Sequence, residues 1–94
     1  YSMLDLTKKY KRNPDVIIKN IGKTQVALNT ESGSEYKLNE VSYDMLEQLS
    51  SGLSVETLIE TMTQLYDVSK ETMTADCKKW LPVALEKELI LLSE

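Results

Sequence analysis

The 94-residue sequence contains no histidine, one cysteine, three glycines and two prolines. Without histidine, zinc sites built from Cys and His and the usual histidine general bases are excluded. The three glycines do not form a phosphate-binding loop, and the carboxylates, although numerous, stand in no recognisable acid–base arrangement. We therefore expect no catalytic residue, no metal site and no cofactor, and we predict that the chain is not an enzyme.

The sequence also lacks the features of a secreted or membrane-spanning protein. A lone Cys77 cannot form an internal disulfide, which fits a reducing compartment. The longest aliphatic run, at residues 89–92, is far shorter than the roughly 20 residues of a membrane helix. No charged segment followed by an apolar signal region precedes the fold. We expect a cytoplasmic protein with no membrane span.

Charge is distributed unevenly along the chain. Residues 1–39 hold seven Lys/Arg against four Asp/Glu, whereas residues 40–94 hold four against eleven. Nucleic-acid-binding proteins usually carry an excess of positive charge, because contacts with phosphates supply much of their affinity. The net charge of −4 therefore argues against a nucleic-acid partner.

Strand patterns come first in the chain. Residues 15–21 are rich in β-branched side chains, and Gly22-Lys23 stands where a two-residue hairpin turn belongs. Residues 24–29 alternate in polarity, and residues 35–38 do so again after a second turn. The sequence predicts a three-stranded antiparallel meander in which the third strand is an edge.

Helical patterns follow from residue 39. Asn39, Ser54 and Ser69 each stand where an N-cap belongs, and Gly52 is placed to end the first helix. Pro82 interrupts the third helix, where we expect a kink. Each helix should bury one stripe of side chains. In the first helix the stripe is Val41, Met45, Leu46 and Leu49, and in the second it is Val55, Leu58, Ile59, Met62 and Leu65. In the third helix it is Met73, Cys77, Leu81, Ala84, Leu85 and Glu88.

These elements predict an α+β domain at residues 14–94, preceded by a flexible N-terminal arm at residues 1–13. A three-stranded antiparallel sheet followed by three helices is the order of a winged helix-turn-helix-like fold. Five short segments follow one another in a definite order within residues 14–92. They are Tyr36-Lys37-Leu38-Asn39, the Ser51-Gly52 turn, residues 54–59 (SVETLI), Leu65-Tyr66 and residues 85–90. Their order and spacing resemble the PqqD family, the leader-peptide recognition elements of systems that modify ribosomally made peptides.

The resemblance implies that a leader peptide is held as an added strand against the third strand, in a cleft walled by the third helix. An edge strand offers unpaired N–H and C=O groups to such a peptide. The facing wall should be the helix stripe rotated by about 100° from the core stripe, with Trp80 as an anchor for an apolar side chain. The candidate peptide-binding residues are Glu35, Tyr36, Lys37 and Leu38 on the strand, and Asp76, Lys79, Trp80, Val83, Ala84 and Lys87 on the helix.

The expected partners are a precursor peptide and a modifying enzyme or leader peptidase of the same pathway. Two other functions remain open. The chain could be a winged-helix DNA-binding regulator, since its third helix carries Lys78, Lys79 and Trp80. On the same predicted helix, however, Asp76, Glu86 and Glu88 would repel phosphate. It could also be an assembly module whose edge strand pairs with another copy of itself.

Overall fold

The structure is a computed structural model that describes residues 5–93. Three antiparallel strands, β2 (Val16–Ile21), β3 (Thr24–Asn29) and β4 (Glu35–Leu38), form a sheet in the order β2-β3-β4. The β2–β3 turn is Gly22-Lys23, and Gly22 takes a φ of 64°, as the first central residue of a type II′ turn requires. The predicted meander is confirmed, and β4 is an edge strand.

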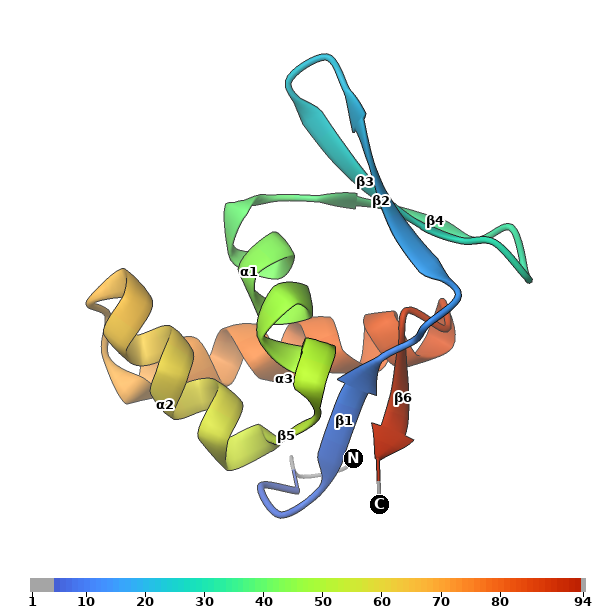
Figure 1. Cartoon of the computed structure of the whole chain (residues 1–94). Coiled ribbons are helices and arrows are strands. Elements are labelled where there is room, and N and C mark those ends of the chain that lie inside the picture. Colours follow the sequence, from blue (N-terminus) through green and yellow to red (C-terminus); the bar gives the residue numbers. More distant parts are fainter. Residues whose placement is uncertain (1–4, 94) are drawn as a thin grey trace.

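Three helices follow the sheet. They are α1 (Glu40–Gln48), α2 (Val55–Tyr66) and α3 (Lys70–Glu86). As predicted, their N-caps are Asn39, Ser54 and Ser69, and each cap side chain accepts a backbone N–H from the first turn. Figure 1 shows α1 below the sheet, with α2 and α3 around it. The predicted fold class, an α+β winged-helix-like domain, is confirmed.

Residues 9–12, which the sequence assigned to a flexible arm, form a strand instead. This strand, β1 (Lys9–Arg12), pairs with β6 (Ile90–Ser93) along its whole length and with the short β5 (Leu53–Ser54), which follows the 3-10 turn η1 (Leu49–Ser51). The first and last strands of the described chain thus lie side by side (Figure 1). The arm was mispredicted because its partner strand lies about 80 residues away in sequence and leaves no local pattern. Residues 1–4 lie outside the described residues.

Most of the predicted apolar stripes are buried, but two leucines are not. Leu65 is 54% exposed and Leu85 is 39% exposed, whereas the earlier apolar members of the same two stripes are buried. Both lie in the last turn of their helix, where packing partners run out. The core joins all three helices to the inner face of the sheet through Val16, Ala27, Leu38, Met45, Leu46, Leu58, Ile59, Met62, Met73, Cys77 and Leu81.

Helix α3 continues through Pro82 without a break, and Pro82 is exposed. The helix ends at Glu86, two residues earlier than the predicted stripe, because Glu88 adopts a left-handed φ of 58°. The N–H of Leu89 donates to the carbonyl of Ala84 at 2.8 Å, and the N–H of Glu88 donates to that of Leu85 at 3.1 Å. This is a Schellman ending with glutamate where glycine is usual, so the sequence carried no stop signal.

Candidate functional site

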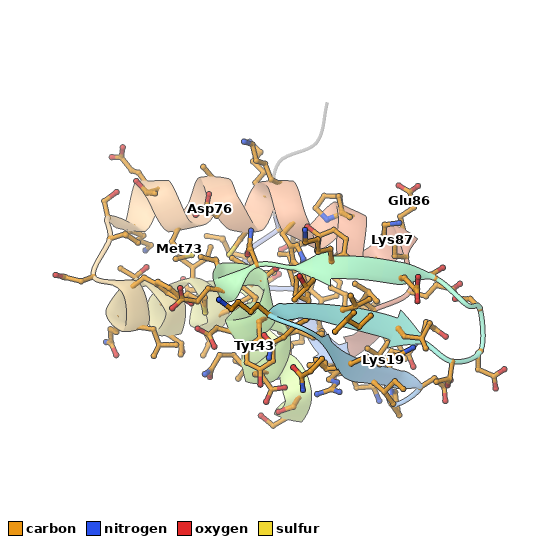
Figure 2. All side chains as sticks on the ribbon, turned by 90° about the horizontal axis from the view of Figure 1, so that it is seen from above. Lys19, Tyr43, Met73, Asp76, Glu86 and Lys87 are labelled. Atoms are coloured by element: carbon orange, nitrogen blue, oxygen red, sulfur yellow. The ribbon has the colours of Figure 1, made fainter. Side chains whose placement is uncertain are left out.

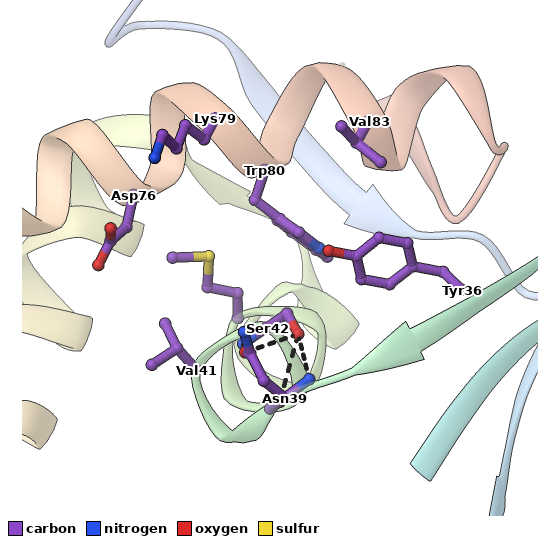
Figure 3. A pocket seen from close by; sticks show the side chains of 9 residues that line it. Tyr36, Asn39, Val41, Ser42, Asp76, Lys79, Trp80 and Val83 are labelled. Carbon is purple, nitrogen blue, oxygen red and sulfur yellow. Dashed lines mark hydrogen bonds between the residues drawn. The ribbon is translucent and has the colours of Figure 1, made fainter. Parts of the chain in front are cut away.

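A cavity of about 390 Å³ lies between β4, the start of α1 and the middle of α3 (Figure 3). Its volume falls near the lower end of the range of about 300–1,000 Å³ that is usual for ligand pockets. Figure 2 shows that α3 runs beside β4, the strand of the sheet nearest to it. The lining residues are Tyr36 from β4, Asn39, Val41, Ser42 and Met45 from the start of α1, and Asp76, Lys79, Trp80 and Val83 from α3.

The start of α1 reaches the cavity because only Asn39 separates β4 from the helix. Asn39 and Ser42 form a capping box: the Asn39 Oδ1 accepts the N–H of Ser42 at 2.8 Å, and the Ser42 Oγ accepts the N–H of Asn39 at 2.9 Å. This reciprocal pair fixes the angle at which the chain leaves the strand. The first turn of α1 is thereby held as one wall of the cavity.

Helix α3 presents two different sides. One side lines the cavity. Its four residues have the spacing i, i+3, i+4 and i+7, which places side chains on one face of a helix; they are Asp76, Lys79, Trp80 and Val83. Cys77 and Ala84 lie on the neighbouring face and are completely buried. The cavity wall and the core contact are therefore adjacent faces of the same helix.

Strand β4 also alternates. Tyr36 is half-buried and Leu38 is buried, whereas Glu35 and Lys37 are exposed, so the first pair faces the helices and the second pair faces outward. Within residues 5–93, β4 pairs only with β3, and no strand occupies its other edge. Every second residue of such an edge directs its N–H and C=O away from the sheet. The cavity thus adjoins an open row of backbone groups.

The indole nitrogen of Trp80 is the one buried side-chain polar atom among the described residues that has no hydrogen-bond partner. Trp80 is only 6% exposed, and its ring lines the cavity. Leaving a buried donor unpaired costs about 1–3 kcal/mol, so such atoms are rare in folded proteins. In Figure 3 the rings of Trp80 and Tyr36 point toward each other across the cavity.

Comparison with known proteins identifies the family of this fold. A sequence profile described as Coenzyme PQQ synthesis protein D (PqqD) matches residues 24–90, a segment that contains every residue lining the cavity. The chain belongs to the PqqD family. The resemblance that the sequence suggested is therefore confirmed. No match was found among curated protein sequences.

A solved structure shares the PqqD-family fold of this chain. It is described as TbiB1 in complex with the TbiA(beta) leader peptide, and the two chains are 24% identical, with a TM-score of 0.64. The alignment covers 85% of this chain and 93% of the other. At this identity the likeness establishes the fold, and TbiB1 is itself a protein whose structure holds a leader peptide.

Half of the residues that the sequence proposed for the PqqD-type site line the cavity: Tyr36, Asp76, Lys79, Trp80 and Val83. The other five lie elsewhere. Leu38 and Ala84 are in the core, Glu35 and Lys37 point to the outer side of β4, and the half-buried Lys87 is the C-cap of α3.

Sequence reasoning missed the contribution of α1 to the cavity, which comes from Asn39, Val41, Ser42 and Met45. One signal was available. The predicted cap at Asn39 follows the third strand directly, so the first turn of the helix had to lie beside the end of that edge strand.

The only thiol of the sequence, Cys77, does not line the cavity. Burial, and then the carboxylate of Asp76, raises the pKa of the Cys77 thiol to about 12, so the sulfur stays protonated and is a poor nucleophile. Among residues 5–93 no group of three potential acidic or thiol ligands could hold a metal ion. In the same part of the chain, no helix has the length and apolarity needed to cross a membrane.

A second hollow of about 400 Å³ lies where β1 leads into β2, beside Asn13, Pro14 and Ser50. Its most prominent cation, Arg12, is already engaged. The guanidinium pairs with Glu47 at 3.2 Å and donates to the carbonyl of Val16 at 3.0 Å. These contacts join β1 to α1 and to β2.

Proposed function

We propose that this PqqD-family domain binds the leader segment of a ribosomally synthesised precursor peptide. In this proposal the leader adds as a strand beside β4, in the cleft against α3, and is presented to a separate modifying enzyme or leader peptidase. The observation that carries the proposal is the position of the cavity directly beside the open edge of β4. The leader peptide in the structure of TbiB1, which shares the fold, supports it.

Alternation of side chains explains how one peptide could use both parts of the site. A peptide paired with β4 would direct every second side chain toward the helices, on the same face as Tyr36 and Leu38. Those side chains would enter the cavity between Tyr36, Trp80 and Val83. Glu35 and Lys37 would then contribute backbone groups, since their side chains point outward.

The binding free energies expected from strand pairing and from side-chain burial differ, so the strand and the cavity would have different roles. About four strand hydrogen bonds at roughly 1 kcal/mol each do not overcome an association cost of at least ~4 kcal/mol together with the ordering of a flexible peptide. Micromolar affinity, about −8 kcal/mol, therefore needs one to three buried side chains at roughly 1.5–3 kcal/mol each. Pairing with β4 would set direction and register, and the cavity would determine which peptide binds.

The chemistry would come from the partner enzyme. Cys77, the single thiol of the sequence, is buried with a raised pKa on the core side of α3. A domain that only holds the leader can deliver the rest of the precursor to any active site that docks beside it. The modifying enzyme or leader peptidase is thus the second partner in this proposal.

A fluorescence titration tests leader binding directly, because Trp80 is the only tryptophan and lies in the cavity. We expect a leader peptide encoded beside this gene to change the emission with a micromolar dissociation constant. Val83→Glu should weaken binding by at least about tenfold, because it places a charge in the apolar part of the cleft. Lys23→Glu, at the exposed β2–β3 turn, is the matched control and should stay within about twofold.

Two results would contradict the proposal. One is that no neighbouring leader binds at tens of micromolar, and the other is that Val83→Glu and Lys23→Glu bind equally well. Duplex DNA is titrated in parallel, since tight, salt-sensitive binding to DNA would favour the regulator hypothesis instead. Light scattering without ligand tests whether β4 pairs with a second copy of the chain.

A further inference from the structure

The polar groups that line the cavity are not equally available to a ligand. Asn39 and Ser42 are engaged with each other through their side chains and backbone. The indole N–H of Trp80 is different, because it is buried and has no partner among the described residues. It is the buried side-chain donor of the cavity that the described part of the fold leaves unpaired.

An indole N–H can only donate, so its complement must be an acceptor. A peptide paired with β4 would direct its own backbone N–H and C=O groups along the plane of the sheet, toward β4. The peptide groups that reach across to α3 are therefore side chains. The acceptor that meets Trp80 must accordingly be carried by a side chain.

Charges around the cavity favour an electronegative group. Lys79 and Asp76 both line it and largely offset each other. The N-terminus of α1 also borders it, and a helix N-terminus carries partial positive charge. Carboxamide and carboxylate oxygens both fit such surroundings, whereas a purely aliphatic side chain would leave the indole N–H buried and unpaired.

We propose that the cleft selects a leader with an Asn, Gln, Asp or Glu at the inward-facing position that enters the cavity, and that the Trp80 N–H donates to its side-chain oxygen. This inference rests on the proposed leader binding and names the side-chain chemistry that the site recognises. Trp80 is then a specificity-determining residue, in addition to being an apolar wall.

The phenolic oxygen of Tyr36 is the competing acceptor within the protein. Figure 3 shows the two rings pointing toward each other, but no hydrogen bond joins the hydroxyl to the indole. The two explanations differ in one respect. If Tyr36 is the acceptor, Tyr36→Phe should abolish any effect of the indole N–H, whereas a peptide acceptor should keep its dependence on Trp80 in that variant.

A double-mutant cycle between protein and peptide tests the proposal. Each amide or carboxylate residue of a binding leader is replaced by Leu, and every peptide is titrated against the wild type, Trp80→Phe and Tyr36→Phe. Trp80→Phe removes the N–H and retains an aromatic ring. We expect one replacement to weaken binding to the wild type and to Tyr36→Phe by about three- to tenfold, and to change binding to Trp80→Phe by less than about twofold.

A second measurement stands on the wild type alone, in case Trp80→Phe fails to fold. A single tryptophan gives a single indole signal in a nitrogen–proton correlation spectrum, and a new hydrogen bond moves that proton downfield. We expect a downfield shift with the native leader and none with its Leu-substituted form.

The outcomes separate this inference from the proposed function. Leader binding without coupling to Trp80 and without the downfield shift would overturn the inference and leave leader binding intact. Failure of the wild type to bind any leader would contradict the proposed function itself.

Discussion

Two buried polar sites in this small domain have opposite hydrogen-bonding states. At the end of α3, Asn13 and Asn29 are 6% and 2% exposed, and their side-chain amides donate to the same carbonyl of Glu88 at 2.9 and 2.7 Å. In the cleft, Trp80 is equally buried, but its indole nitrogen has no partner among the described residues. Equal burial has produced a satisfied network in one place and an unsatisfied donor in the other.

If the proposed contact with Trp80 holds, the difference separates groups that stabilise the fold from a group that a ligand pairs. The Oδ1 of Asn29 also accepts the N–H groups of Glu31 and Ser32 at 2.9 and 3.0 Å, so this side chain closes the β3–β4 loop as well as reaching α3. Fully satisfied networks of this kind rigidify a fold. An unsatisfied buried donor lowers the stability of the fold, and a ligand that supplied an acceptor would recover that cost.

Among the variants that test this comparison, Asn29→Ala should have the largest effect, and the effect should be on stability. The change leaves two loop N–H groups and part of the Glu88 carbonyl unpaired, so we expect the free energy of unfolding to fall by about 3 kcal/mol. Urea denaturation followed by circular dichroism measures it. Asn20→Ala, on an exposed position of β2, is the control and should change stability by less than about 0.5 kcal/mol.

The folded fraction of Asn29→Ala should still bind the leader within about twofold of the wild type. Weaker peptide binding by the folded fraction would mean that the two sites are not functionally distinct. The comparison on which the account depends would then fail.

A smaller effect is expected from single N-methyl groups placed along the leader. In a paired strand only alternate residues donate to the neighbouring strand, so methylation should cost about tenfold in affinity at every second position and little between them. Isothermal titration calorimetry measures the series. A uniform loss along the peptide, or no loss at any position, would argue against strand addition to β4.

The smallest effects should come from the two charged residues of the cleft. Asp76→Asn and Lys79→Gln are nearly isosteric changes of opposite charge at exposed side chains, and each should alter affinity by less than about fivefold. The two changes should act in opposite directions, and both should shrink at high salt. Changes in the same direction would show that packing, and not charge, dominates at the rim.

The sequence predicted the parts of the fold that depend on local pattern. Thr24–Asn29 and Glu35–Leu38 were expected with the bounds that the structure has, and the caps at Asn39, Ser54 and Ser69 were recognised from their side chains. In contrast, Lys9–Arg12 reads as a basic segment, and only its long-range pairing with Ile90–Ser93 makes it a strand. Such a pairing has no periodic signature of its own.

The lining of the cavity was predicted on α3, where helix periodicity determines it, and was missed on α1, where three elements converge. The spacing of Asp76, Trp80 and Val83 placed them together on α3. The same periodicity placed Ala84 on the core stripe, where it packs, although Ala84 was also named as a candidate for the cleft. The unpaired nitrogen of Trp80 could not be foreseen, because it depends on the absence of an acceptor from every neighbouring element.

Backbone hydrogen exchange, with and without saturating leader peptide, tests the central claim most directly, because the β2-β3-β4 sheet contains its own control. The account predicts that the outward-facing amides of β4 become protected by at least about tenfold, while those at the opposite edge, on β2, do not change beyond the gain in global stability. Protection of β2 instead of β4, or protection of neither edge by a leader that binds, would contradict it.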